Sequence, residues 1–486
     1  MRSGIFGLAL AAVLAFPAAP APAPPQYDAN PFVFPITTHT GPVTDAPGGL
    51  AVLLFGFLDA DEAIDFVVVG ETGASAYDHF GKELWQLERA STYNHRADKE
   101  TGTQLGYHAT AGVVGNHAFY FVDASQTGLV VVDGASGRIR EVIDIGPEQW
   151  TDVGLGHLFS TSGPEDVILL KDGYIGGFTG YRNTNRVAAI RHGEQAIGWA
   201  FETEPHQGIA FAHMRVADVD GDGFDEICTG RVCVDHDGTR ELMRLEDPFW
   251  GHLRLGSYTT LQVADLFPDH PGLEAFAGHY FIGKYGVRSF VFGLEGLQKH
   301  YESGSNVHSA VLGNLDLKPE WHGPEALIRS NKDRENDPPD VRRLRFLNFA
   351  TGEELIQAHF PENSWQDAME GDRAKGSYPR FIDWDGDEQQ EVCLIERHVR
   401  NPRISVNDGM TGVRLMETAH RGNGEGMGRV FDVSGDGREE VIVWNLNEIA
   451  IYWNPDAPAG PVPLKRAARD YLLRSRHGSF VYNYPQ

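Results

Sequence analysis

The sequence predicts an all-β fold, a single β-propeller of seven or eight blades with mostly four antiparallel strands in each blade. Three observations support this prediction. The chain contains 56 Gly and 27 Pro that separate many short Val-, Ile- and Phe-rich runs, and long amphipathic helical patterns are scarce. An internal repeat recurs about every 45 residues. Each copy holds three or four short strands around an Asp-rich turn, which is the pattern of propeller blades.

We count eight copies of the repeat along the chain. The clearest copies begin at Met214, Pro379 and Gly428, weaker ones begin at Phe55, Leu261 and Ala310, and two degenerate ones lie between residues 55 and 214. No blade can bury both of its faces alone, so the ring must close. We expect the segment NPFVFPITT, residues 30–38, to pair with the last blade. Seven blades remain the alternative if one weak copy is a long loop.

The chain carries a formal net charge of −27. Such a charge argues against nucleic acid or an anionic membrane as a partner. An anionic substrate would also be repelled unless basic residues are concentrated in one place. We therefore expect any site for a polyanion to be a local group of Arg, Lys and His.

The first residues indicate export. A single Arg precedes an apolar run from Ile5 to Phe16, and small residues and prolines follow, which is typical of a secretory signal peptide. We expect residues 1–23 to be this signal peptide and residues 24–486 to form the propeller. The apolar run is too short to span a bilayer. The expected protein is a monomer, secreted or periplasmic, with no membrane partner.

Three cysteines in an exported chain cannot all pair with one another. Cys228 and Cys233 flank the sequence TGRV and face each other if residues 230–231 form a tight hairpin turn. A cross-strand disulfide, half of a Zn²⁺ site and two reduced, packed thiols are all open interpretations of this pair. Cys393 occupies the place of Cys228 in another copy of the repeat, so we expect it on a different blade.

The copy at residue 214 contains DVDGDGFDE, an alternation of Asp and Gly that is typical of a Ca²⁺-binding loop. The candidate ligands are the carboxylates of Asp218, Asp220, Asp222 and Glu226 and the main-chain carbonyl of Phe224. Similar sets recur in the copies at residues 379 and 428. The same turn also persists in propellers without metal, as an Asx-type cap. A turn repeated around a ring is more naturally scaffold than active site, so we expect any Ca²⁺ here to be structural.

Residues that break the repeat are better candidates for chemistry. The innermost strand of each blade lines the central channel and should immediately precede the Asp turn. The chain places His108, His213, His308 and Tyr378 at these positions. One channel histidine is usually a structural hydrogen-bonding group, but several imidazoles and phenols in one concavity indicate acid–base work or a metal.

Tyr, His and Arg also occur together in residues 171–192, 250–258 and 278–288. This trio suits β-elimination on a uronic acid. An arginine meets the carboxylate bidentately and neutralises it, a base removes the C5 proton, and an acid protonates the departing glycosidic oxygen. Hydrolysis normally needs a pair of carboxylates, and the Asp turns look committed to structure.

The segments VADVDGDGFDEI, VDHDGT, GHLRLG and VADLFPDHPGLEAFAGH, in this order, resemble the β-propeller rhamnogalacturonan lyases. The resemblance is strongest from about Ala212 to His279, and outside this stretch only the repeat is shared. The related propeller ulvan lyases are nearer to this chain in size. Both groups cleave rhamnose–uronate polysaccharides by β-elimination, so the resemblance implies a secreted lyase with an anionic polysaccharide as its substrate.

The resemblance also implies a calcium set from which this chain departs. In the rhamnogalacturonan lyases, three histidines and two acidic residues help to bind a catalytic Ca²⁺. His213, His252 and His279 match the histidines, but Arg254 and Tyr280 stand where the acidic residues would be. The resemblance therefore favours neutralisation of the substrate carboxylate by side chains, as is thought to occur in the ulvan lyases.

We accordingly predict an enzyme similar to the ulvan lyases. The predicted neutraliser of the substrate carboxylate is Arg191. Its predicted acid–base partners are Tyr174, as acid or base, and His108, as base or supporting residue. These assignments rest on order along the chain and on expected position in the ring.

Further residues are predicted to bind the substrate. They are His95, which lies in a long insertion that we place over the mouth of the propeller, His117 and His213. Arg254, Tyr258 and Tyr280 form a rival cluster for the same reaction. Two alternatives to ulvan cleavage stay open: a rhamnogalacturonan lyase, and a non-catalytic propeller that binds carbohydrate or protein.

Overall fold

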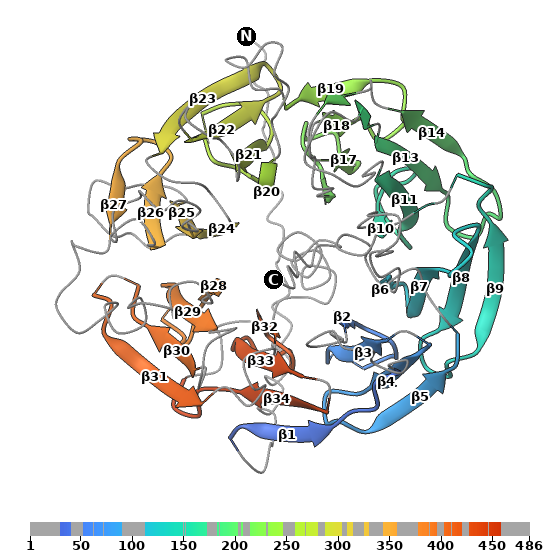
Figure 1. Cartoon of the computed structure of the whole chain (residues 1–486), viewed down its shortest axis with the longest axis horizontal. Helices are drawn as coiled ribbons and strands as arrows, with labels where there is room; N and C mark the ends of the chain where they lie inside the picture. Colours follow the sequence, from blue (N-terminus) through green and yellow to red (C-terminus); the bar gives the residue numbers. More distant parts are fainter. Residues whose placement is uncertain are drawn as a thin grey trace, which may run out of the picture.

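The structure, a computed structural model, is a ring of β-sheets (Figure 1). It describes residues 30–39, 52–61, 63–70, 72–89, 112–148, 150, 152–172, 182–183, 185–202, 206–207, 214–229, 232–245, 258–267, 269–279, 287–303, 309–313, 325–329, 344–356, 378–387, 389–395, 403–409, 411–419, 427–445 and 447–457. These residues form strands and turns and no α-helix. Accordingly, this part of the chain contains no helix with the length and apolarity that a bilayer span requires.

Eight four-stranded antiparallel sheets form the blades within the described ranges. The strands of the first four blades, in chain order, are as follows: blade 1, β2 (Val52–Gly56), β3 (Asp65–Val69), β4 (Ala74–Tyr77) and β5 (Glu83–Leu87); blade 2, β6 (Val113–Gly115), β7 (Ala118–Val122), β8 (Gly128–Asp133) and β9 (Ile139–Asp144); blade 3, β10 (Asp152–Gly156), β11 (Asp166–Asp172), β13 (Asn185–Ile190) and β14 (Trp199–Glu202); blade 4, β16 (Arg215–Ala217), β17 (Glu226–Cys228), β18 (Val232–Val234) and β19 (Glu241–Arg244). A separate pair, β12 (Arg182–Asn183) and β15 (His206–Gln207), accompanies blade 3 in the sequence.

The other four blades repeat this order. Their strands are as follows: blade 5, β20 (Tyr258–Ala264), β21 (Glu274–His279), β22 (Val287–Gly293) and β23 (Gly296–Ser303); blade 6, β24 (Ser309–Gly313), β25 (Glu325–Arg329), β26 (Leu344–Asn348) and β27 (Glu354–Ile356); blade 7, β28 (Tyr378–Ile382), β29 (Glu391–Ile395), β30 (Arg403–Asn407) and β31 (Arg414–Ala419); blade 8, β32 (Met427–Phe431), β33 (Glu440–Trp444), β34 (Glu448–Tyr452) and β1 (Phe32–Pro35). The all-β propeller predicted from the repeat is confirmed, with eight blades.

The ring closes through β1, which is the fourth strand of blade 8. It pairs antiparallel with β34, from Phe32 opposite Ile451 to Pro35 opposite Glu448. The N–H of Ile36 extends the pairing to the carbonyl of Asn447, at 2.8 Å. The expected pairing of residues 30–38 with the last blade is therefore confirmed, and Figure 1 shows β1 beside β34 at the rim.

The strand order gives the ring two different faces. The first strand of each blade lies nearest the centre and the fourth lies at the rim (Figure 1). Turns between the first and second strands and between the third and fourth strands share one face, which we call the Asp-turn face. The innermost strands begin on the other face, which we call the insertion face because the long insertions of the sequence join strand ends there.

Apolar side chains between neighbouring blades form the core. One cluster joins blades 8 and 1 through Phe66, Phe431 and Ile451, and similar clusters join successive blades around the ring. Burial of one such side chain stabilises the fold by roughly 1.5–3 kcal/mol. Because strand residues alternate between two faces, each blade contributes to a cluster on either side. This packing explains why a single repeat cannot fold alone.

The Asp turns share a buried carboxylate at the first residue of the second strand. In blade 4, Glu226 Oε2 accepts the N–H of Val219 at 2.6 Å, and in blade 3, Asp166 Oδ2 accepts that of Leu158 at 3.0 Å. Equivalent bonds occur in blades 1, 5, 7 and 8. We call these residues the closing carboxylates. Blade 2 differs, since a short turn replaces the Asp turn between β6 and β7.

Cys228 and Cys233 form a disulfide across the hairpin between β17 and β18. They are directly opposite in the strand register, with a Cα–Cα distance of 3.8 Å, and both are fully buried. The disulfide interpretation is therefore the one that the structure supports. Half of a Zn²⁺ site gains no support from this pair, because disulfide sulfurs are not the thiolates that zinc requires. Cys393 is a free, buried thiol on blade 7, as expected from its place in the repeat.

Replacing both bridged cysteines, Cys228→Ala with Cys233→Ala, is expected to lower the free energy of unfolding by about 2 kcal/mol, because a short cross-link restricts the unfolded chain modestly. Urea unfolding of the oxidised protein measures the change. Cys393→Ala is the matched control, since it removes a buried thiol from an equivalent strand without removing a cross-link. Reductant should destabilise the parent protein and not the double variant.

Candidate functional site

The Asp turn of blade 4 brings three of the predicted metal ligands together. Ligand oxygens of Asp218, Asp220 and Glu226 lie within 4.8 Å of one another. Main-chain N–H groups hold Asp218, because Gly221 donates to Oδ1 at 2.8 Å and Gly223 donates to Oδ2 at 3.0 Å. Both glycines have positive φ, 80° and 93°, a conformation that other residues adopt only with strain. The DGDG sequence therefore specifies the local shape of the loop.

Asp222 differs from the sequence-based expectation, whereas the main-chain carbonyl of Phe224 stays a predicted ligand. The described group of converging ligands does not include Asp222, whose Oδ1 accepts the N–H of Phe224 at 2.8 Å and whose Oδ2 lies 3.8 Å from His236 Nε2. The ring of Phe224 stacks on the His236 imidazole, with centroids 4.2 Å apart. The side chain of Asp222 thus contacts the hairpin between β18 and β19.

Glu226 supplies the observation that fits a cation. Its side chain is fully buried, and Oε1 has no hydrogen-bond partner among the described residues. Burial, together with the negative charges of Asp220 and Asp222, raises the pKa of Glu226 to about 8. An uncompensated buried carboxylate is costly. A divalent ion held by oxygen ligands would remove this cost.

Groups of three carboxylates also occur in two other blades, although the second member in blade 8 comes from the position of Asp222. Blade 7 brings together Asp383, Asp385 and Glu391, and blade 8 brings together Asp432, Asp436 and Glu440. Burial raises the pKa of Glu391 to about 8, and that of Glu440 is also raised. Carboxylate sets of this kind fit Ca²⁺ among common cations, because Ca²⁺ prefers hard oxygen ligands and tolerates irregular geometry.

Several predicted site residues lie outside the described residues. They are His95, His108, Tyr174, His213, Arg254 and Tyr280. Tyr258 is described in its main chain as the first residue of β20. The structure therefore locates the strand ends to which these segments are joined, and their predicted roles stay predictions.

Arg191 lies on the Asp-turn face. It is exposed, follows the last residue of β13, and places its guanidinium carbon 4.9 Å from the ring centroid of Phe159 in the Asp turn of blade 3. The insertion that contains Tyr174 joins the opposite end of the same strand, next to Asn185. Six strand residues separate these ends by about 20 Å. The arrangement argues against Arg191 as the neutraliser in a site with Tyr174.

His117 also lies on the Asp-turn face. It forms the short turn between β6 and β7 with Asn116, and both residues have positive φ, 54° and 53°. Its side chain is exposed, and its main-chain carbonyl accepts the N–H of Gly134 at 2.9 Å. A turn role accounts for this position. The structure gives no support to the predicted contribution of His117 to a channel site.

Three of the tyrosines and histidines named in the sequence analysis lie at strand ends on the insertion face. Tyr258 at the start of β20 is opposite His279 at the end of β21 in the register of blade 5. Tyr378 begins β28 on the same face, as predicted for an innermost strand. Arg254 and Tyr280 lie within a few residues of the first pair in the sequence. Of the rival cluster, the structure therefore places the main chain of Tyr258 at the insertion-face end of blade 5.

Sequence reasoning missed three basic residues on innermost strands. Arg215, Arg380 and Arg429 each stand three residues before the first Asp of their turns. Each donates from Nη1 to the carbonyl of the residue before it, at 2.8–3.1 Å. Burial lowers the pKa of Arg215 to about 10. An alignment of the three clearest copies reveals this shared arginine. It was missed because the sequence analysis looked for residues that differ between the copies.

Residues 177–326 match the family model described as "Rhamnogalacturonan lyase family 11, C-terminal domain". The rhamnogalacturonan exolyase YesX of Bacillus subtilis is 27% identical over 351 residues, covering 66% of this chain and 50% of the relative. The rhamnogalacturonan endolyase YesW of the same organism is 36% identical over 105 residues, 20% of this chain and 16% of the relative. The chain spans about half the length of the first of these relatives.

Solved structures agree on the fold. The crystal structure of the exotype rhamnogalacturonan lyase YesX superposes with a TM-score of 0.55 at 19% identity, over 89% of this chain and 76% of that one. A rhamnogalacturonan lyase of Bacillus licheniformis gives 0.55 at 20% identity, over 90% and 79%. The resemblance to the propeller rhamnogalacturonan lyases is confirmed by these matches, whereas they lend no support to ulvan as the substrate.

The raised pKa values predict a pH dependence of stability in chelator. Folded Glu226 and Glu391 keep their protons up to about pH 8, whereas unfolded carboxyls release them near pH 4.5. Their contribution to stability is therefore full below about pH 4.5 and is lost as the pH rises to about 8. We expect the melting temperature in chelator to fall by several degrees across this range. Ca²⁺ added at pH 8 should restore it, and Glu226→Gln should weaken both effects; a melting temperature that rises with pH would contradict this account.

Proposed function

We propose that this chain is a polysaccharide lyase that cleaves a rhamnose–uronate polysaccharide of the rhamnogalacturonan type by β-elimination. The match of residues 177–326 to the rhamnogalacturonan lyase domain carries this proposal. That range contains the Asp turn of blade 4 and the strand ends at Tyr258 and His279. The fold similarity extends over the whole ring but carries no information about the substrate.

The proposed site lies on the insertion face of blades 4 and 5. Tyr258 and His279 are neighbours in the strand register there, and Arg254 precedes Tyr258 by four residues. An acidic chain needs a local basic group to bind a polyanion, and the Asp-turn face is rich in carboxylates. Arg191 and His117 lie on that acidic face, so we assign neither of them to the reaction.

The proposed chemistry is carried out by side chains. Arg254 neutralises the uronate carboxylate, which makes the C5 proton more acidic. Tyr258 or His279 removes that proton, the C5–H electron pair forms the C4–C5 double bond, and the C4–O bond breaks. The partner residue protonates the departing oxygen. The products are an unsaturated uronate end and a new hydroxyl end, so no water is consumed.

We further propose that Ca²⁺ bound in the Asp turns is structural. Asp218, Asp220 and Glu226 would hold it in blade 4, where it would neutralise the closing carboxylate. This loop lies at the opposite end of the strands from the proposed catalytic residues. Chelation is therefore expected to lower thermal stability without entering the chemical step.

Incubation of the mature protein with rhamnogalacturonan and, separately, with ulvan tests the substrate. Ultraviolet absorbance of the conjugated double bond reports elimination, and we expect it to increase on rhamnogalacturonan. An increase in absorbance with ulvan alone would contradict the proposed substrate. It would favour the interpretation as an ulvan lyase, which was based on Arg254 and Tyr280. Absence of signal on both, with tight binding of either, would favour a non-catalytic propeller.

Substitutions distinguish the two candidate sites. Tyr258→Phe should lower kcat by about 10²–10⁴-fold, since it removes a proton-transfer group and keeps the ring. Arg254→Lys should also lower kcat, because an ammonium does not meet a carboxylate bidentately. Arg191→Gln serves as the comparison and should leave kcat and KM unchanged. A large loss of kcat in Arg191→Gln, together with full activity in Tyr258→Phe, would assign the reaction to Arg191, Tyr174 and His108 instead.

A further inference from the structure

The Asp turn of blade 1 departs from the pattern at its first ligand position. The turn runs over residues 57–64, the same length as residues 218–225 in blade 4. When the two turns are aligned on their closing carboxylates, Asp65 and Glu226, Phe57 stands at the position of Asp218. Phe57 is 2% exposed and packs in the apolar cluster of blades 8 and 1. The first carboxylate of an oxygen-only calcium set is therefore missing here.

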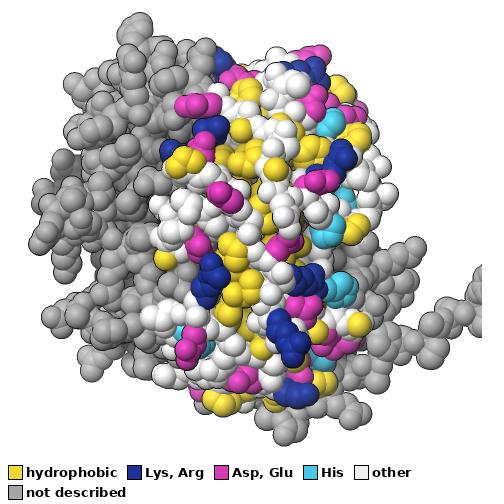
Figure 2. All heavy atoms as spheres, turned by 90° about the vertical axis from the view of Figure 1, so that its right-hand side faces the viewer, with side chains coloured by type: hydrophobic (Ala, Val, Ile, Leu, Met, Phe, Trp, Pro, Cys, Tyr) yellow, Lys and Arg dark blue, Asp and Glu magenta, His cyan; other side chains and the backbone are white. Residues whose placement is uncertain are grey.

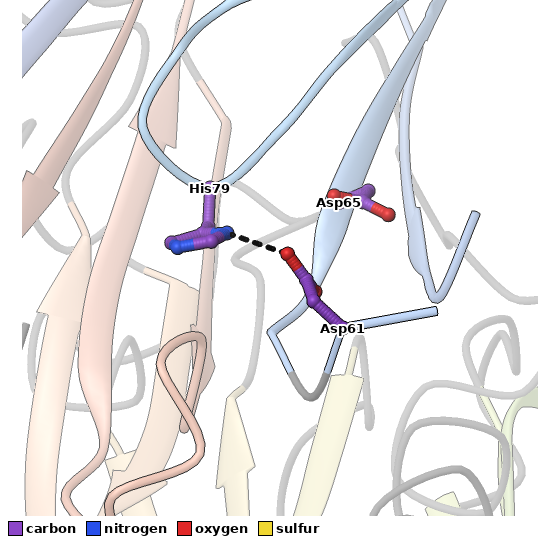
Figure 3. Close-up of side chains that lie close together, drawn as sticks. All are labelled: Asp61, Asp65 and His79. Atoms are coloured by element: carbon purple, nitrogen blue, oxygen red, sulfur yellow. Dashed lines mark ion pairs between the residues drawn. The ribbon is translucent and has the colours of Figure 1, made fainter. Parts of the chain in front are cut away.

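A histidine joins the remaining carboxylates instead. Ligand atoms of Asp61, Asp65 and His79 lie within 4.8 Å of one another. Figure 3 shows Asp61 from the turn, Asp65 from the start of β3 and His79 from the hairpin between β4 and β5 close together. Nδ1 of His79 lies 3.7 Å from Oδ2 of Asp61. The group therefore offers one imidazole nitrogen and two carboxylates.

Two of these side chains each carry a buried polar atom without a hydrogen bond among the described residues. Asp65 is 0% exposed; its Oδ2 accepts the N–H of Leu58 at 2.8 Å, and its Oδ1 has no hydrogen-bond partner among the described residues. Nδ1 of His79 is also buried without such a partner in the described part of the chain. Burial raises the pKa of Asp65 to about 7. Unsatisfied buried polar atoms are rare and costly, and a cation would satisfy both.

The equivalent histidine of blade 4 has a different environment. His236 occupies the same hairpin position as His79, and its Nε2 lies 3.8 Å from Asp222. Its Nδ1, however, lies 2.9 Å from the carbonyl oxygen of Leu158, so it has a hydrogen-bond partner. The described ligand group of blade 4 contains carboxylates alone. A His–Asp contact and a buried closing carboxylate are thus common to both blades, whereas the histidine nitrogen without a hydrogen bond is the feature that distinguishes blade 1 from blade 4 among the described residues.

We propose that Asp61, Asp65 and His79 form a binding site for a divalent transition-metal ion, with Zn²⁺ as the best match. Imidazole nitrogen is a good ligand for Zn²⁺ and related ions, whereas Ca²⁺ takes six to eight oxygens. A tetrahedral ion with bonds of about 2.0–2.2 Å separates its ligand atoms by about 3.3–3.6 Å. The distance between His79 and Asp61 is already close to this value. The Asp61 side chain is 44% exposed, which leaves a solvent-accessible side for a water ligand.

The ion would act where the ring closes. Ile64, next to Asp65, donates its N–H to the carbonyl of Val433 in blade 8 at 2.8 Å. The site would tie the turn and the outer hairpin of blade 1 together beside this contact. It lies on the Asp-turn face, together with several other histidines of the described surface, which appear along the right-hand edge in Figure 2. The proposed ion would therefore stabilise the fold and would take no part in the proposed elimination reaction.

Metal titration of the full mature chain tests the proposal. The protein is stripped with chelator and then kept in excess Ca²⁺, so that carboxylate-only loops are filled. Co²⁺ is added as an optical probe and Zn²⁺ is followed by calorimetry. We expect stoichiometric uptake with visible ligand-field absorption, and a higher melting temperature with Zn²⁺. His79→Gln should weaken binding by more than about tenfold. His236→Gln, at the equivalent position, should bind as the parent does.

Three results would overturn the proposal: no uptake in excess Ca²⁺, the same affinity in His79→Gln as in the parent, or an equal loss in His236→Gln. Asp61→Asn provides a second variant, because its exposed side chain can change without disturbing the core. Circular dichroism of the metal-free variants shows whether the fold is kept. None of these measurements depends on lyase activity, so the metal proposal and the functional proposal fail independently.

Discussion

A buried carboxylate at the start of the second strand accepts the main-chain N–H of the turn before it, in six of the described blades. The residue before this carboxylate reaches the preceding blade. Asp225, for example, donates its N–H to the carbonyl of His157 at 2.9 Å and accepts the N–H of His157 at 2.7 Å. Turn shape and blade-to-blade contact are thus set by adjacent residues. The Asp-rich repeat is conspicuous because the same short polar network recurs in these six blades.

Because these hydrogen bonds all lie on the Asp-turn face, the two faces of the ring differ in what they contain. The face that holds the blades together is crowded with carboxylates and tight turns, and substitutions there act on stability. The other face carries strand ends joined by long insertions. The match to the rhamnogalacturonan lyase domain covers residues on blade 5 whose strand ends reach that face. Division of this kind allows one ring to hold its shape while its binding surface changes.

The sequence predicted the ring, its closure and its repeating turn because these depend on local patterns of apolar residues, Asp and Gly. It did not predict which face Arg191 occupies, because that depends on the number of strands between the insertion and the arginine. The state of Cys228 and Cys233 also stayed open, since spacing alone cannot separate a disulfide from two thiols. The group at Asp61, Asp65 and His79 was missed because Phe57 weakens the match of this copy to the repeat and the histidine comes from another hairpin.

The pairing of β1 with β34 has a consequence for folding kinetics. Asn30 donates a hydrogen bond to the carbonyl of Trp453, 423 residues further along the chain. Contacts of such high sequence separation form late, because the chain must first lose the entropy of a very large loop. During synthesis, the first strand has no partner until the last blade exists. Until then β1 is an unpaired strand, and such a strand is where self-association would begin.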